Sequence, residues 1–199
     1  MGERITSKEH PMVTRFMTKE FTDVMVKSWT PQSEVWSFKY GNDLLGIMNA
    51  MNGSLIMHNI RKQLNLRPYA RVTCYAPIAA LSYILTDGFH ANFITRQILG
   101  FESCPICIVI KAGLMQASLG VAYPFVLAPL IGFYISDRLL TYPVPSIHRA
   151  PKELFNLWLK MITKNPRFIY ASITIQVVAA CLVTSEKQSF FYNFIGKKN

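Results

Sequence analysis

Residues 106–135 read ICIVIKAGLMQASLGVAYPFVLAPLIGFYI and decide the fold, because Lys111 is the only charged residue among them. A helix of that length extends about 45 Å, whereas the hydrocarbon core of a bilayer is about 30 Å thick. Pro124 and Pro129 fall inside the segment, and a proline in a helix interior removes a hydrogen bond and kinks the helix. We therefore predict one long, kinked membrane span here, with a span followed by a short interfacial helix as the alternative.

Three further apolar runs, at residues 44–60, 72–87 and 168–184, are separated by short links that hold most of the charged residues. The first run, as a helix, extends roughly 25 Å, slightly less than the hydrocarbon core. The pattern predicts an all-α integral membrane domain of four transmembrane helices over residues 44–199.

Residues 1–43 form a separate, peripheral segment in this interpretation. Apolar side chains recur there at helical spacing, with charged residues on much of the other face, which predicts an amphipathic helix that lies on the membrane, on a partner or on its own protein. The apolar positions are Met12, Phe16, Met17, Phe21, Val24 and Met25. The first residues have no apolar core, so no secretory signal is visible and we expect any mitochondrial targeting signal to be internal.

The distribution of charge predicts how the chain is oriented. The formal net charge is +10, yet residues 1–43 carry six basic and six acidic side chains, so the excess belongs to residues 44–199. The links 61–71 and 136–167 are each +4, whereas the link 87–107 is −1. Basic residues gather on the cytoplasmic or matrix side of membrane proteins. We therefore place both basic links on that side and both termini on the other, and we do not expect nucleic-acid binding.

Small and polar residues form stripes on the predicted spans, where they allow two helices to approach closely. We predict that these residues pack helices or dock a partner. They are Gly46, Asn49, Ala50, Gly53, Ala76, Ala80, Gly113, Ala117, Gly120, Tyr123 and Pro124.

Cys104 and Cys107 form a CPIC motif at the start of the long apolar segment. A two-residue spacing suits a redox pair or half of a metal site, but zinc usually takes four ligands and a second pair is missing. A local disulfide or two idle thiols remain the simpler interpretations. The sequence shows no phosphate-binding loop or nucleophile motif, so we predict no catalytic residues, no metal and no cofactor.

From residue 44 onward the chain resembles the transmembrane protein 126 family of the mitochondrial inner membrane. The resemblance rests on the order and spacing of several segments rather than on one motif. They are NIRKQLNLRPYAR at 59–71, Thr86-Asp87, CPICIVIKAGL at 104–114, SLGVAYPFVLAPLIG at 118–132, TYPVPS at 141–146, Trp158, NPRF at 165–168 and Gln176.

The resemblance implies a non-catalytic assembly factor, a membrane scaffold or chaperone, for the membrane arm of respiratory complex I. It implies that the partners are complex I membrane-arm subunits and intermediates, membrane lipid, and other assembly factors, namely Ecsit and an acyl-CoA dehydrogenase relative. The basic links would face the matrix, with both termini in the intermembrane space. One alternative is a lasting accessory subunit of complex I. Another, of a different class, is a thiol-redox membrane protein that uses Cys104 and Cys107.

Overall fold

The computed structural model of this chain describes residue 24 and residues 34–99, 104–145 and 151–196. Within these ranges every regular element is helical. The all-α prediction is confirmed for this part of the chain. The predicted amphipathic helix near residues 12–25 falls outside the described residues, except for Val24.

The first helical hairpin joins α3 (Gly41–Gln63) to α4 (Arg71–Phe89), with the short helix α2 (Trp36–Lys39) before it. Each helix covers one predicted apolar run and extends past it at both ends. The second does not stop at Asp87, since α4 continues into a π-helical segment, η2 (His90–Thr95), and then into α5 (Arg96–Leu99).

The long apolar segment forms a single continuous helix, Pro105–Leu139. It consists of α6 (Pro105–Ala117), a π-helical segment η3 (Ser118–Ala122) and α7 (Tyr123–Leu139). Pro105 occupies the first turn of α6, where a missing N–H costs nothing. The π-helical segment ends at Ala122, two residues before Pro124, so the regular helix is interrupted close to this proline.

The basic link 136–167 contains a helix that the sequence analysis did not predict, α8 (Pro151–Thr163). Its first turn carries Glu153 and its last turn Lys160, the arrangement that the helix dipole favours. Its apolar side packs on the core through Leu154, Leu157, Trp158 and Met161. The last helix, α9 (Pro166–Gly196), is longer than the predicted run 168–184.

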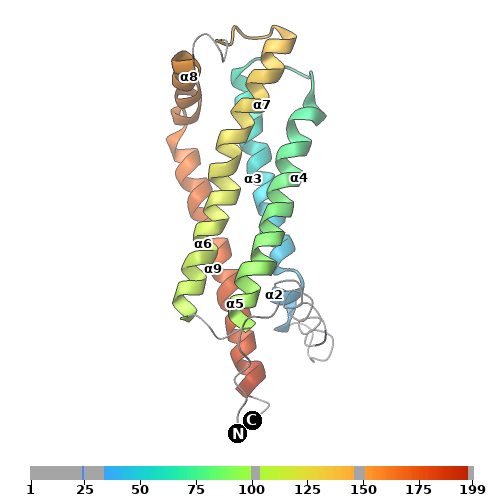
Figure 1. The fold of residues 1–199 in the computed structure, drawn as a ribbon, viewed down its shortest axis with the longest axis vertical. Coiled ribbons are helices and arrows are strands. Elements are labelled where there is room, and N and C mark those ends of the chain that lie inside the picture. The colour runs from blue at the N-terminus through green and yellow to red at the C-terminus, as the bar shows by residue number, and fades with distance from the viewer. Residues whose placement is uncertain (1–23, 25–33, 100–103, 146–150, 197–199) are drawn as a thin grey trace, which may run out of the picture.

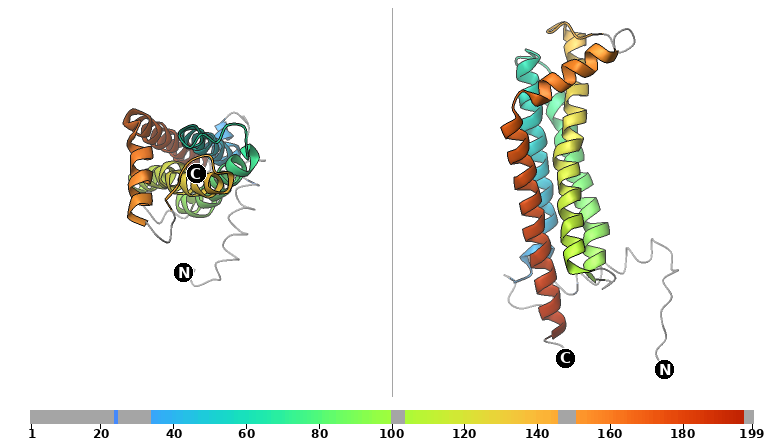
Figure 2. Two further views of the ribbon diagram at one scale, coloured as in Figure 1. Left: turned by 90° about the horizontal axis from the view of Figure 1, so that it is seen from above. Right: turned by 90° about the vertical axis from the view of Figure 1, so that its left-hand side faces the viewer.

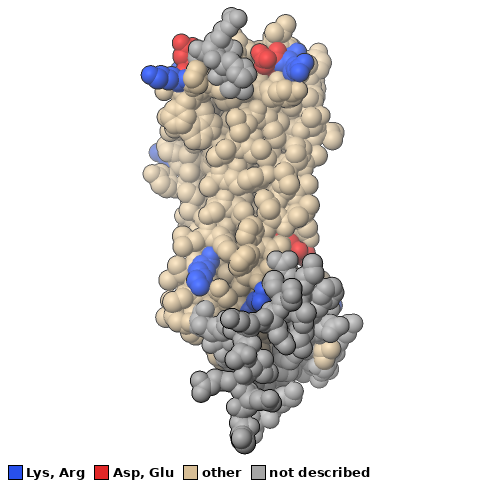
Figure 3. All heavy atoms as spheres, viewed as in Figure 1, with Lys and Arg blue, Asp and Glu red and all other residues tan. Residues whose placement is uncertain are grey.

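The helices form an elongated bundle in which consecutive long helices run in opposite directions (Figures 1 and 2). The helix α3 packs against α4, α7 and α9, while α6 packs against α9. The two basic links therefore lie at the same end, where α8 crosses the bundle, and the start of α2 and the end of α9 lie toward the other end (Figures 1 and 2). On the face shown in Figure 3, charged side chains gather near the ends, with a broad uncharged band between them.

Two helices of the described chain are long and apolar enough to cross a membrane, namely Pro105–Leu139 and Pro166–Asn193. Between the long helices, apolar cores fill both halves of the bundle. One lies around Ile56, Ile60, Ile78 and Phe133 near the basic links. The other lies around Val35, Ile94, Ile108 and Phe190, near the opposite end.

The contact of α3 with α4 tests this packing directly. A Cβ atom at Gly53 would lie 2.8 Å from Cγ2 of the buried Ile78, whereas one at Gly88 would meet nothing within 4 Å. We predict that Gly53→Ala lowers the free energy of unfolding by about 1–3 kcal/mol relative to Gly88→Ala. Both variants gain the same helix propensity, so the difference isolates the clash.

The measurement is denaturant or thermal unfolding of the full chain in detergent micelles. Equal stability of the two alanine variants would contradict the close packing of α3 on α4.

Candidate functional site

Three buried amide side chains meet at the centre of the bundle, and we call them the amide network: Asn49 from α3, Gln116 from α6, and Gln176 from α9. Burying an amide without a hydrogen bond costs several kcal/mol, roughly 4–8 into a medium that offers no partner. Such groups are kept only where the fold supplies partners for them.

Gln116 is the hub of the amide network and is fully buried. Its Nε2 lies 3.1 Å from Oδ1 of Asn49, 3.0 Å from Oε1 of Gln176 and 3.2 Å from the Leu45 carbonyl oxygen. Its Oε1 lies 3.2 Å from Nε2 of the buried His90 in η2. One side chain therefore connects α3, α9 and η2 to α6.

The remaining bonds of the amide network bring in α4 and complete the pairing. Asn49 donates to Oγ1 of Thr86 at 2.6 Å, and Thr86 in turn donates to the Ser82 carbonyl at 2.7 Å. Gln176 donates to the Met48 carbonyl at 3.2 Å. Hydrogen bonds between helices within a membrane average about 0.6 kcal/mol each. These hydrogen bonds act together here, because they connect α3, α4, α6 and α9 at one level of the bundle.

Two side chains compensate for the prolines of the long helix. Pro124 has no N–H to offer the Gly120 carbonyl four residues earlier, and Asn52 donates to that carbonyl at 2.6 Å. Pro129 likewise leaves the Phe125 carbonyl without its usual donor, and Nε1 of Trp158 donates to it at 3.1 Å. Freed carbonyls inside membrane helices need such donors, because lipid offers none.

Small residues let the helices reach these partners. A Cβ atom at Gly120 would fall well inside the van der Waals radius of Oδ1 of Asn49. One at Gly46 would lie 2.8 Å from the Tyr83 ring, and one at Gly113 would lie 3.3 Å from Val177. The glycines are thus required by close helix approach on both sides of the network.

The structure separates the predicted packing and docking residues into three groups. Buried between helices of this chain are Gly46, Asn49, Gly53, Gly113, Gly120 and Pro124. Half-buried are Ala50, Ala117 and Tyr123. Exposed on α4 are Ala76 and Ala80. Docking of a partner stays a prediction. Ala76 and Ala80 are the two of these residues that a partner can contact without separating the helices of the bundle.

Sequence reasoning missed Lys187, which is only 1% exposed. Its Nζ donates to Oδ1 of Asn42 at 2.5 Å and lies 5.9 Å from the centre of the Phe38 ring. The predicted last span ends at residue 184, which leaves Lys187 in a polar tail, whereas α9 continues to Gly196. The sequence does contain a helical pattern that includes Lys187. Successive spacings of four, three and four residues connect Gln176, Ala180, Val183 and Lys187, and the first three are buried.

Cys104 and Cys107 lie exposed at the start of α6, with their sulfur atoms 2.7 Å apart. The backbone N–H of Cys107 donates to Sγ of Cys104 at 3.3 Å. The hydrogen bond from the Cys107 thiol lowers the pKa of Cys104. Both cysteines are free thiols in this structure, and a disulfide between them stays a prediction.

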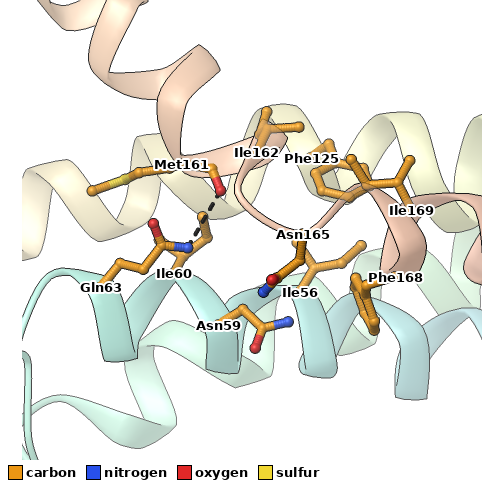
Figure 4. A pocket seen from close by; sticks show the side chains of 10 residues that line it. All are labelled: Ile56, Asn59, Ile60, Gln63, Phe125, Met161, Ile162, Asn165, Phe168 and Ile169. Carbon is orange, nitrogen blue, oxygen red and sulfur yellow. Dashed lines mark hydrogen bonds between the residues drawn. The ribbon is translucent and has the colours of Figure 1, made fainter.

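The cleft in Figure 4 is too small for a substrate. It lies between α3, α7 and the α8–α9 junction, where Nε2 of Gln63 donates to the Met161 carbonyl at 3.3 Å. Its volume of about 20 Å³ suits a water molecule. Elsewhere in the described chain, no group of three or more His, Cys, Asp and Glu side chains could hold a metal ion.

A family model described as transmembrane protein 126 matches residues 16–198. A curated relative from Drosophila melanogaster, named transmembrane protein 126, is 33% identical over 183 residues, which are 90% of this chain and 82% of the relative. Another from Pongo abelii, named transmembrane protein 126A, is 22% identical over 158 residues, which are 79% of this chain and 78% of that relative. No solved structure matches the chain.

The Trp158 donor predicts a coupling with Pro129. In Trp158→Phe the Phe125 carbonyl loses its donor, whereas Pro129→Ala returns a backbone N–H to it. We predict that Trp158→Phe costs about 0.5–1.5 kcal/mol more in the natural background than in Pro129→Ala. The packing lost with the indole is the same in both backgrounds, so a double-mutant cycle removes it.

The cycle is measured as unfolding free energies in micelles, with Trp36→Phe as the matched control, since Trp36 lies on α2, at the opposite end of the bundle from α8. A coupling of zero for Trp158, or an equal coupling for Trp36, would contradict the assignment.

Proposed function

The chain belongs to the transmembrane protein 126 family, and from that premise we propose that it is a non-catalytic assembly factor for the membrane arm of mitochondrial complex I. Family membership is the observation that carries the proposal, through the role that the family resemblance implies. The geometry agrees with such a role, since the buried amides of Asn49, Gln116 and Gln176 bind one another.

We propose that α3 and α4 cross the membrane together with the two longer apolar helices, which makes four spans. At 23 and 19 residues, α3 and α4 extend about 35 and 28 Å, close to the hydrocarbon thickness. The amides of α3 point inward, and its exposed face is apolar. That face consists of Leu44, Ile47, Met51 and Leu55. A helix with its polar side buried and its apolar side outward suits lipid.

The orientation follows from the two basic links, which the fold brings to one end. We propose that this end faces the matrix and that both termini face the intermembrane space, in the inner membrane. The amphipathic helix α8 lies across this end, with Phe155 and Leu159 exposed on its outer side. Such a helix fits the membrane interface, where apolar side chains meet headgroups.

The mechanism we propose is holding. The exposed ridge of Ala76 and Ala80 on α4 admits a neighbouring helix closely, and Val72 and Ile84 continue that ridge with large side chains. An unfinished membrane subunit of complex I would dock there. The basic end would meet the soluble partners, Ecsit and the acyl-CoA dehydrogenase relative.

A second candidate function is thiol redox, favoured by the 2.7 Å approach of the two exposed sulfur atoms. It differs from holding in needing both thiols. Cys104→Ser with Cys107→Ser would then abolish complex I assembly at an unchanged level of the protein, whereas holding leaves assembly intact.

The direct test is a native-gel complexome profile of mitochondrial membranes in mild detergent, with the protein tagged. We expect comigration with partial complex I particles. A peak only at the mature complex would make the protein an accessory subunit, and a peak at neither would contradict a role in complex I.

The docking ridge adds a variant to that test. We expect Ala76→Leu with Ala80→Leu to reduce comigration about tenfold, by blocking close helix approach. Ala171→Leu, at an exposed position of α9, is the matched control and should leave it unchanged. Equal comigration of the two variants with partial complex I particles would contradict docking at Ala76 and Ala80.

A further inference from the structure

An open, basic pocket lies where α3 gives way to α4, at the end of the bundle that carries the basic links. Its volume is about 550 Å³. Its lining contains four Lys or Arg side chains and no acidic one, and consists of His58, Arg61, Lys62, Arg67, Pro68, Arg71 and Tyr75. Such a pocket concentrates positive potential and favours an anion.

Arg61 forms the buried base of this pocket, and its side chain is only 5% exposed. Its guanidinium donates to the carbonyls of Arg67 and Tyr69, both at 2.8 Å, and to Sγ of Cys74 at 2.9 Å. It also lies over the Tyr75 ring, 5.6 Å from its centre. These partners are uncharged, so they satisfy the N–H groups without neutralising the charge.

The same bonds hold the link between the helices in a demanding backbone conformation. Asn65, Arg67 and Ala70 all have positive φ, at 55°, 46° and 50°, a region that residues other than glycine seldom adopt. Local strain of this kind persists only where surrounding contacts impose it. The link therefore places the exposed side chains of Arg67 and Arg71 beside Lys62 before any ligand arrives.

We propose that this pocket binds the phosphate headgroup of an acidic phospholipid. Exposed apolar side chains border it, since Leu55 lies one turn from His58 on α3 and Val72 one turn from Tyr75 on α4. A ligand with phosphate at one end and acyl chains at the other matches that combination. Basic pockets between membrane helices bind acidic lipid headgroups in this way.

The charge of the pocket also predicts a preference among lipids. Four cations pair more completely with a headgroup of two phosphates than with a headgroup of one. We expect diphosphatidylglycerol to bind more tightly than phosphatidylglycerol, and phosphatidylcholine, whose headgroup carries no net charge, to bind least. The inference rests on the proposed crossing of α3 and α4, because only then does the pocket open at a leaflet.

The test is native mass spectrometry of the full chain, purified in a zwitterionic detergent and titrated with each of the three lipids. Arg67→Gln with Arg71→Gln should weaken diphosphatidylglycerol binding about tenfold or more. Arg61 is kept, because its bonds support the link. Lys160→Gln with Lys164→Gln removes the same charge at the same end of the bundle and is the matched control. We expect the control to bind like the natural chain.

Thermal unfolding without added lipid separates loss of binding from loss of folding, and both double variants should unfold like the natural chain. Equal binding of phosphatidylcholine, or equal loss in the two double variants, would overturn the proposal. Displacement of the lipid by millimolar inorganic phosphate alone would overturn it too, since the site would then select a soluble anion. Lipid binding is measured on the purified chain, without complex I. Comigration with partial complex I particles could therefore still be observed if the lipid did not bind, and the two proposals can fail separately.

Discussion

The hydrogen bonds of Gln116 are the interaction on which the rest of the bundle depends. Its amide contacts α3, α9 and η2 at one level, and Asn49 passes the connection on to α4. In an apolar interior these groups can satisfy one another only in one arrangement of the helices, because a shift of any helix leaves a buried donor or acceptor without its hydrogen-bond partner. The hydrophobic cores at the two ends are less selective, since apolar side chains tolerate small displacements.

The prolines extend the same constraint along the long helix. Each proline leaves one backbone carbonyl without its usual helical donor, and a side chain from another helix donates to that carbonyl. Asn52 donates to the Gly120 carbonyl, and Trp158 donates to the Phe125 carbonyl. The second bond ties α8 to α7 across the end of the bundle. With the amides bonded to one another inside the bundle, the surfaces that we propose for a partner and for a lipid are the exposed ridge of α4 and the basic end. Those surfaces carry both proposals.

Much of this fold is readable from the sequence. The length of the segment 106–135 and its prolines predicted one long, kinked helix, and the structure has one continuous helix with a π-helical segment close to Pro124. Spacing identified the glycines that lie between helices. The partners of Gln116 were not readable, because they come from residues about 60 and 70 positions away. The α8 helix was missed although Leu154, Leu157, Trp158 and Met161 recur at helical spacing, because the whole segment was interpreted as a basic link. Lys187 was hidden because a charged residue ordinarily marks the end of a span, and here α9 continues past it with Lys187 facing inward.

Accessibility of single cysteines to a membrane-impermeant maleimide tests the four-span arrangement most directly. Tyr40→Cys, Pro68→Cys and Pro143→Cys place exposed thiols before α3, between α3 and α4, and after α7, and Cys104 marks the start of α6. We predict that in mitoplasts Cys104 and the thiol introduced at 40 react from outside, whereas those at 68 and 143 react only after the inner membrane is opened. Reaction at 68 and 104 from the same side would contradict it.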